Sequence, residues 1–503
     1  MVSISSFPLC HCLFHGKSKL VFQAALLLLA GGALEAQPFP SLEPAPQAHE
    51  YARRIAHNGG HWRDLAEASL WASSVNAGPE AEGRAAAYLG RIEAAVAELT
   101  AADLPLDVKE RGEYILNFLH RRFLKSYSAN QTRVDEILAS GRYNCVSSAA
   151  LYMVLARSAG LDAAGVVTRD HAFATVNTGA EFIDVETTNR YGFDPGNRKE
   201  FHDAFGKITG FAYTPAKNYR DRTAIGGAEL VSLILANRIS ALEEQKRYAD
   251  AVPLAINRAA LLSTSAVQHG ELFSDPRQDM MRSLFNVGVH YIQTGKEDNA
   301  IAWAKYAEGR YPDPAGWQEL YKSAANNKLV KLIRAKKTSD ARSTLAAVQP
   351  KLSDENYREL DTMVFDAEAV DKVNAVRNSA ETQAALAFLA QDGGRLQPQR
   401  RDEMRTKVIL DEAERLRKAR KSAEAINWLE SAMRQYGANA KLETALRTLR
   451  QDRVAELHNE FAGLYNRRQF EQAKVSIQRS LQEFPGDRTL VQDLNLVEKA
   501  LQQ

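Results

Sequence analysis

The sequence predicts a mixed α+β domain followed by an all-α array of helical repeats. Apolar residues recur at three- and four-residue spacing over most of the chain, which is typical of amphipathic helices. Short runs rich in β-forming residues gather between residues 164 and 185. With 503 residues the chain can hold two or three domains, and its 45% hydrophobic and 25% charged content is ordinary for a soluble globular protein.

The N-terminus carries the signs of an export segment. Lys17 and Lys19 precede an apolar run over residues 20–33, and Ala36 follows it. A basic flank, a short apolar core and a small residue at the end are typical of a secretory signal peptide. We therefore expect residues 1–36 to be a signal peptide or, if uncleaved, an N-terminal anchor. The protein would be exported, to the bacterial periplasm or to the membrane surface that faces it.

Residues 37–47 are rich in proline and predict a linker. Residues 48–225 are expected to form the α+β domain. Its first part has helical periodicity, with predicted helices at 65–75, 81–99 and 109–126. Three β-rich runs follow, at 164–168, 172–176 and 181–185, and Thr178-Gly179 provides a hairpin turn between the last two. These runs predict a small antiparallel sheet that follows a helix.

Residues 226–503 are helical in pattern and contain an internal repeat. The clearest unit, at 283–312, resembles the tetratricopeptide repeat at Gly288, Tyr291, Gly295, Ala300, Ala307 and Pro312. Weaker copies follow the same pattern at Tyr248, Ala251, Ala255 and Ala259, at Ala413, Ala425 and Ala432, and at Phe470, Ala473 and Pro485, and the stretch around Ala341 resembles a further degenerate unit. A single unit cannot bury its own apolar face, so the units are expected to stack into a solenoid. The alternative is an irregular helical domain.

Cys145 is the only cysteine beyond the export segment, and it lies where a loop runs into a predicted helix. The N-terminus of a helix carries partial positive charge, which favours a thiolate over a thiol. His171 follows, and then Asp184 and Glu186. A cysteine, a histidine and a carboxylate are the parts of a cysteine nucleophile site. Asp184 and Glu186 are two residues apart and face the same side of a strand, so strand geometry does not choose between them.

The segment from His171 to Asn189 resembles the histidine-to-aspartate strand pair of the transglutaminase-like superfamily. Phe173 falls on the family tryptophan, Glu186 on the catalytic aspartate and Thr188 on the threonine. The stretch that begins at Asn144-Cys145 is similar to the nucleophile helix of that family, so the likeness covers roughly residues 110–195.

This resemblance implies a transglutaminase-like, papain-like fold and cysteine acyl-transfer chemistry. Cys145 would be the nucleophile, His171 the general base and Glu186 the orienting acid. The sequence departs from the family at two positions, with Glu186 in place of aspartate and Phe173 in place of tryptophan. Neither change removes a reacting atom.

The predicted function is that of an exported cysteine-dependent amide hydrolase or acyltransferase whose helical repeats bind a protein or peptide partner. The alternative is a catalytically silent scaffold that mediates protein–protein interaction through its repeats. Redox or metal chemistry at Cys145 would lack a second cysteine and a ligand cluster, so no cofactor and no metal is expected. The net charge of +2 gives no reason to expect nucleic-acid binding, and membrane association is expected only through the N-terminal segment.

Overall fold

The computed structural model describes residues 39–56, 60–169, 171–209, 222–265, 275–391 and 394–502. The predicted signal peptide or anchor, residues 1–36, and the first two residues of the predicted linker lie outside these ranges. None of the helices in the described ranges is both long and apolar enough to cross a membrane. The chain divides into two compact units, Met1–Leu320 and Tyr321–Gln503.

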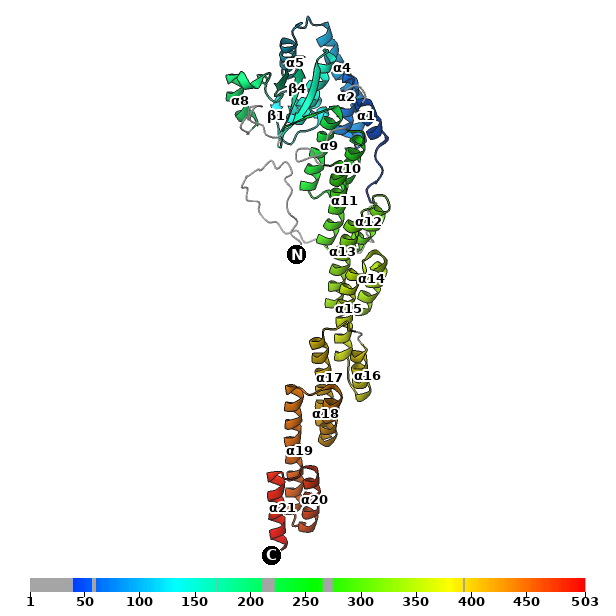
Figure 1. Cartoon of the computed structure of the whole chain (residues 1–503), viewed down its shortest axis with the longest axis vertical. Coiled ribbons are helices and arrows are strands. Elements are labelled where there is room, and N and C mark those ends of the chain that lie inside the picture. The colour runs from blue at the N-terminus through cyan, green and yellow to red at the C-terminus, as the bar shows by residue number, and fades with distance from the viewer. Residues whose placement is uncertain are drawn as a thin grey trace. The chain divides into compact units, whose positions relative to one another are not determined.

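The first unit is built mainly of helices, which surround a small sheet (Figure 1). Its helices are α1 (Pro46–Ala56), α2 (Trp62–Ser74), α3 (Pro79–Gly83), α4 (Ala85–Ala101), α5 (Val108–Arg122), α6 (Val134–Ser140), α7 (Cys145–Ser158), the 3₁₀ helix η2 (Pro195–Asn197), α8 (Lys199–Thr209), α9 (Gly227–Glu244), α10 (Tyr248–Leu261), α11 (Pro276–Gln293) and α12 (Glu297–Glu308). Its strands are β1 (Ser126–Tyr127), β2 (Arg142–Tyr143), β3 (Asp162–Val167), β4 (Ala172–Asn177), β5 (Phe182–Val185) and β6 (Thr223–Ile225).

The larger sheet is antiparallel, in the order β5-β4-β3-β6. The predicted small antiparallel sheet is therefore confirmed, including the β4–β5 hairpin, whose turn uses Gly179 at a φ of 87°. The sequence did not reveal β6, because three residues are too few to show an alternating pattern. β1 and β2 form a separate parallel pair.

The predicted α+β class with a papain-like core is wrong. In the described part of the chain the strands form only two small sheets, of two and four strands, and helices make up most of the structure. The longest strands have six residues, whereas the helices around them supply most of the buried apolar side chains. The prediction was wrong because three short β-forming runs were taken as evidence for a domain built on a larger sheet.

The centre of the first unit is α7, whose residues Val146–Ala156 are all buried. It packs against α2, α5, α9 and the sheet. Tyr152 donates its hydroxyl proton to the carbonyl oxygen of Gly112 in α5, over 3.2 Å. A Cβ atom on Gly112 would lie 2.4 Å from the ring of Phe193, so only glycine allows this close approach. Packing on all sides fixes the helix that begins at Cys145.

The helices after residue 226 form hairpins that share one turn geometry. The connecting turn holds a residue of positive φ at Lys246, Gly295, Lys336, Arg420 and Arg468. Five residues after each of them comes a fully buried alanine: Ala251, Ala300, Ala341, Ala425 and Ala473. Alanine lets the two helices of a hairpin approach closely at this point. The structure thus repeats at the positions of small residues that the sequence singled out, while membership of the tetratricopeptide family stays a prediction.

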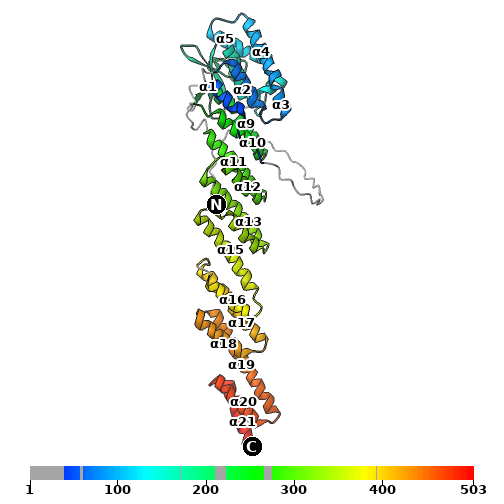
Figure 2. The ribbon, with the colours of Figure 1, turned by 90° about the vertical axis from the view of Figure 1, so that its right-hand side faces the viewer.

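Two tryptophans repeat in the same way. Trp303 in α12 donates its indole N–H to the carbonyl oxygen of Leu284 in α11, over 2.8 Å. Trp428 donates to the carbonyl oxygen of Ile409 over 3.0 Å, with the same separation of 19 residues. Figure 2 shows α9, α10, α11 and α12 following one another as neighbouring helices, and each contacts the next.

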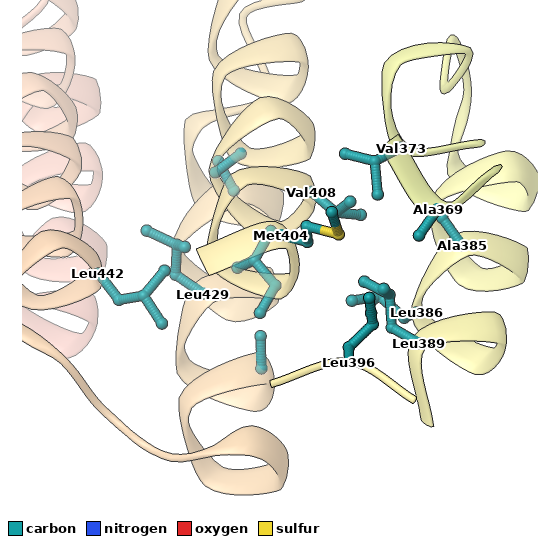
Figure 3. Close-up of a cluster of buried hydrophobic side chains, with 14 of the residues drawn as sticks. Ala369, Val373, Ala385, Leu386, Leu389, Leu396, Met404, Val408, Leu429 and Leu442 are labelled. Atoms are coloured by element: carbon teal, nitrogen blue, oxygen red, sulfur yellow. The ribbon is translucent and has the colours of Figure 1, made fainter. Parts of the chain in front are cut away.

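The second unit is helical throughout its described residues. Its elements are α13 (Pro314–Arg334), which begins in the first unit, α14 (Thr338–Val348), the 3₁₀ helix η4 (Gln349–Lys351), α15 (Asp354–Asn374), α16 (Ser379–Ala390), α17 (Pro398–Lys418), α18 (Ser422–Tyr436), α19 (Ala440–Asn466), α20 (Phe470–Glu483) and α21 (Arg488–Leu501). An apolar cluster joins α15 to α19, as Figure 3 shows with Leu386, Val408 and Leu429. A second cluster around Phe461 joins α19, α20 and α21.

Candidate active site

Cys145 is the first residue of α7 and a free, partly exposed thiol. The helix begins with a capping box, in which Oδ1 of Asn144 accepts the backbone N–H of Ser147 and Oγ of Ser147 accepts the N–H of Asn144, each over 3.0 Å. Reciprocal capping of this kind fixes the first turn of a helix. The thiol therefore has a defined position at the positive end of α7, as the sequence predicts.

His171, just before β4, lies between the thiol and a carboxylate. Its Nε2 is 2.6 Å from Oε2 of Glu186, and its ring is also hydrogen-bonded to Cys145. The side chain of His171 is 11% exposed and that of Glu186 is 3% exposed, whereas Cys145 is a partly exposed residue.

The carboxylate of Glu186 is held on both oxygens. Oε2 contacts His171, while Oε1 accepts the backbone N–H of Thr188 over 3.1 Å and its hydroxyl over 2.6 Å. The backbone N–H of Glu186 donates to the carbonyl oxygen of Gly192 over 2.7 Å. Three hydrogen bonds to one buried carboxylate leave it little freedom to turn away from the imidazole.

Asp184 has a different partner. Its two oxygens accept hydrogen bonds from the guanidinium of Arg222, over 2.7 and 3.0 Å. That guanidinium also lies over the ring of Phe173, 5.5 Å from its centroid. The β4–β5 register places Asp184 opposite Thr175, well along the strand from His171, whereas Glu186 lies just beyond the end of β5. The structure thus brings together Cys145, His171 and Glu186, and sets Asp184 apart from them.

The surroundings of His171 act on its pKa in opposite directions. Burial favours the neutral imidazole and would lower the pKa. The negative charge of Glu186 and the hydrogen bond and charge of Cys145 favour the imidazolium, and together they outweigh burial. The pKa of His171 therefore lies well above its usual value of 6.5, so the ring is protonated at neutral pH.

The raised pKa of His171 predicts how this site contributes to stability. The unfolded state releases the proton near pH 6.5, while the folded state holds it to higher pH. The stabilisation is fully present below about pH 6.5 and is lost as the pH rises through the raised pKa. We expect the stability advantage of the wild type over His171→Gln, measured by urea unfolding, to be constant at acidic pH and to shrink at alkaline pH. An advantage that grows with pH would contradict this expectation, and His49→Gln, at an exposed position in α1, is the control.

Two further side chains hold the backbone that directly follows Glu186, and the sequence analysis identified neither of them. Nε2 of His120 in α5 is 3.0 Å from the carbonyl oxygen of Thr187, and the hydroxyl of Tyr143 donates to the carbonyl oxygen of Thr188 over 3.1 Å. Burial lowers the pKa of His120 to about 4, so its ring is neutral and its Nε2–H donates to Thr187. Burial, with the charge of Glu186, raises the pKa of Tyr143 to about 12.

No neighbouring residue in the sequence marks His120 as part of a site. It meets its partner across 67 residues, a separation at which no local motif can report a contact. Tyr143 gave a weak signal, because it stands two residues before Cys145. Within the described ranges no group of three histidine, cysteine, aspartate or glutamate side chains is arranged to hold a metal ion.

Comparison of the chain with protein-family models, with curated proteins and with solved structures gives no match. The family resemblances drawn from its motifs therefore stay predictions. The function proposed below depends on the contacts among Cys145, His171 and Glu186.

Proposed function

We propose that the protein is an exported cysteine-dependent enzyme that hydrolyses an amide or transfers its acyl group. The observation that supports this proposal is the position of His171, hydrogen-bonded to the Cys145 thiol on one side and to the fixed carboxylate of Glu186 on the other. A nucleophile, a base and a group that orients the base are the three parts that such chemistry needs. The motifs around Cys145 and His171, which resemble those of transglutaminase-like proteins, point to the same chemistry.

Each side chain has a defined part in the reaction. In the resting site His171 already holds the proton of the Cys145 thiol, and the thiolate attacks the carbonyl carbon of the amide to give a tetrahedral oxyanion. The imidazolium then gives that proton to the amine, which leaves as the C–N bond breaks, and a thioester remains. Water, deprotonated by His171, attacks the thioester and releases the acid and the thiol. An amine in place of water would complete an acyl transfer.

The first turn of α7 can assist the oxyanion. Cys145 is the first helical residue, so its backbone N–H has no acceptor within the helix. An N–H group at the positive end of a helix stabilises negative charge that develops on a carbonyl oxygen beside it. Glu186 would keep the ring of His171 in position and compensate its positive charge throughout the cycle.

The substrate class follows from the chemistry and from the predicted compartment. An amide in a protein, a peptide or a cell-wall peptide would suit an exported cysteine enzyme, with the helical hairpins selecting the partner. Hydrolysis is favoured over crosslinking because nothing in the sequence points to a site for an acceptor amine.

The experiment that tests the proposal is the pH dependence of iodoacetamide alkylation at Cys145, followed by peptide mass mapping so that Cys10 and Cys12 do not interfere. A free thiol is mostly protonated below about pH 8.5 and reacts slowly there. We expect the wild type to stay reactive well below that pH, because the imidazolium of His171 stabilises the thiolate. In His171→Ala the rate should instead fall with pH as it does for a free thiol.

Slow labelling that does not depend on His171 would contradict the proposed chemistry. It would favour the alternative, a catalytically silent scaffold that binds a partner through its helical hairpins. Circular dichroism of His171→Ala is the necessary control, because loss of the buried imidazole must not be confused with loss of the fold.

A further inference from the structure

A short segment that follows the predicted export sequence covers a surface of the helical hairpin α11/α12. We call residues 39–43 (Phe-Pro-Ser-Leu-Glu) the strap. The strap belongs to no helix or strand, and both it and the hairpin belong to the first unit. Because residues 37–47 are rich in proline, the sequence predicted a linker here, yet the strap is bound by several specific contacts.

The first contact is an aromatic anchor. The ring of Phe39 lies 5.4 Å from that of Trp303 in an edge-to-face arrangement and 5.5 Å from that of Tyr306 in a stacked one. The ring of Tyr291 in α11 is 6.5 Å away. Aromatic pairs at such distances stabilise by more than the area they bury. Three aromatic side chains from two helices therefore form a receptor site for one ring.

The second set of contacts lies towards the other end of the strap. Leu42 is buried, with 4% of its surface exposed, and its carbonyl oxygen accepts the hydroxyl of Tyr311 over 2.8 Å. The carboxylate of Glu43 forms a bidentate pair with the guanidinium of Arg310, over 2.8 and 3.1 Å. The strap is thus held by three kinds of contact: the aromatic site around Phe39, the burial and backbone hydrogen bond of Leu42, and the bidentate ion pair of Glu43.

These are the contacts by which a folded surface binds an extended peptide: side-chain anchors at intervals, with polar groups that fix the register. All the receptor groups are on or next to the hairpin, and none of the recognised atoms requires a covalent link to the rest of the chain. We propose that this surface is a binding site for an extended peptide with an aromatic residue, an aliphatic residue three positions later and a carboxylate next to it. The strap is its built-in occupant.

The tether decides when another peptide can bind. A segment on a short flexible link competes at an effective concentration in the millimolar range. A free peptide with the same contacts would seldom displace the strap, so the wild type is a covered site. A partner gains access when its own contacts are stronger or when the strap is released. The proposal rests on the proposed function in one respect, since it names the partner class of the repeats, but it requires no chemistry at Cys145.

The test uses the full chain with a weakened strap, Phe39→Ala with Glu43→Arg, and a fluorescent peptide of residues 37–45 (Gln-Pro-Phe-Pro-Ser-Leu-Glu-Pro-Ala). We expect saturable binding by fluorescence anisotropy, at least about tenfold tighter than to the wild type, where the tethered strap competes. Adding Arg310→Glu should weaken binding at least about threefold, and a peptide with arginine in place of its glutamate should then restore it. Lys305→Glu is the matched control, because Lys305 is an exposed cation in α12, five residues before Arg310.

A weakened-strap protein that keeps its helical circular dichroism and thermal transition but shows no saturable binding would overturn the proposal, and the strap would then be a structural staple. If the double variant does not fold, Glu43→Arg alone changes only the exposed ion pair and is tested with the same peptide. Alkylation of Cys145 is measured on the same samples, so that a failure of peptide binding is distinguished from a failure of the proposed chemistry.

Discussion

Replacing Glu186 with glutamine should remove most of the reactivity of Cys145 at neutral pH, whereas replacing Asp184 with asparagine should leave it nearly unchanged. The charge of Glu186 is a main reason why the pKa of His171 is raised despite burial. An opposite charge within hydrogen-bond distance shifts a pKa by roughly one to three units, so its loss should lower the imidazolium population by about 100-fold once the pH exceeds the new pKa. The Cys145 thiolate would then lose the stabilising charge of the His171 imidazolium.

Alkylation rates at several pH values measure this effect, and Asp184→Asn is the matched control. The two acids are two residues apart in the sequence, yet Asp184 pairs with Arg222 whereas Glu186 contacts His171. We expect Glu186→Gln to slow alkylation at neutral pH by about 100-fold and Asp184→Asn by less than about twofold. Equal effects of the two substitutions would show that the general negative charge of this face, and not the Glu186–His171 contact, sustains the reactivity.

The parts of the candidate site that lie close together in sequence could be predicted. Cys145 at a helix start follows from the loop residues before it and the apolar run after it, and the His171 strand from a hairpin whose turn contains Gly179. The choice between Asp184 and Glu186 could not be predicted, because alternation places both on one face. The structure decides it by the β4–β5 register and by Arg222, a residue 38 positions away from Asp184.

The class of the fold was harder to predict than its helices. The 3.6-residue periodicity showed the helices of both units, but the short β-forming runs suggested a larger sheet than the one that forms. For the strap the sequence instead underestimated the amount of fixed structure. Proline-rich composition is typical of a linker, and only partners more than about 250 residues away hold Phe39 and Leu42 in place.

Gly192→Ala should damage both the fold and the site, because the backbone leaves no room for a methyl group at this position. A Cβ atom on Gly192 would lie 2.0 Å from the carbonyl oxygen of Glu186 and 2.9 Å from that of Asn189. Backbone atoms cannot rotate away as a flexible side chain can, so relief requires the loop to move. Overpacking in a well-packed region costs about 1–3 kcal/mol, and a backbone clash of this kind should reach at least the upper end of that range.

The same movement would reach the imidazole. The carbonyl oxygen of Gly192 accepts the backbone N–H of Glu186, so displacing this residue carries the carboxylate away from His171. We expect urea unfolding to show a loss of about 3 kcal/mol and Cys145 alkylation at neutral pH to fall towards that of a free thiol. Gly196→Ala, four residues on in η2, is the control, because a Cβ atom there meets nothing within 4 Å. A Gly192→Ala protein that is as stable as the wild type but alkylates slowly would show that the substitution acts only by displacing the Glu186 carboxylate. Unchanged alkylation in a destabilised protein would show that the reactivity of the thiol does not depend on the position of Glu186.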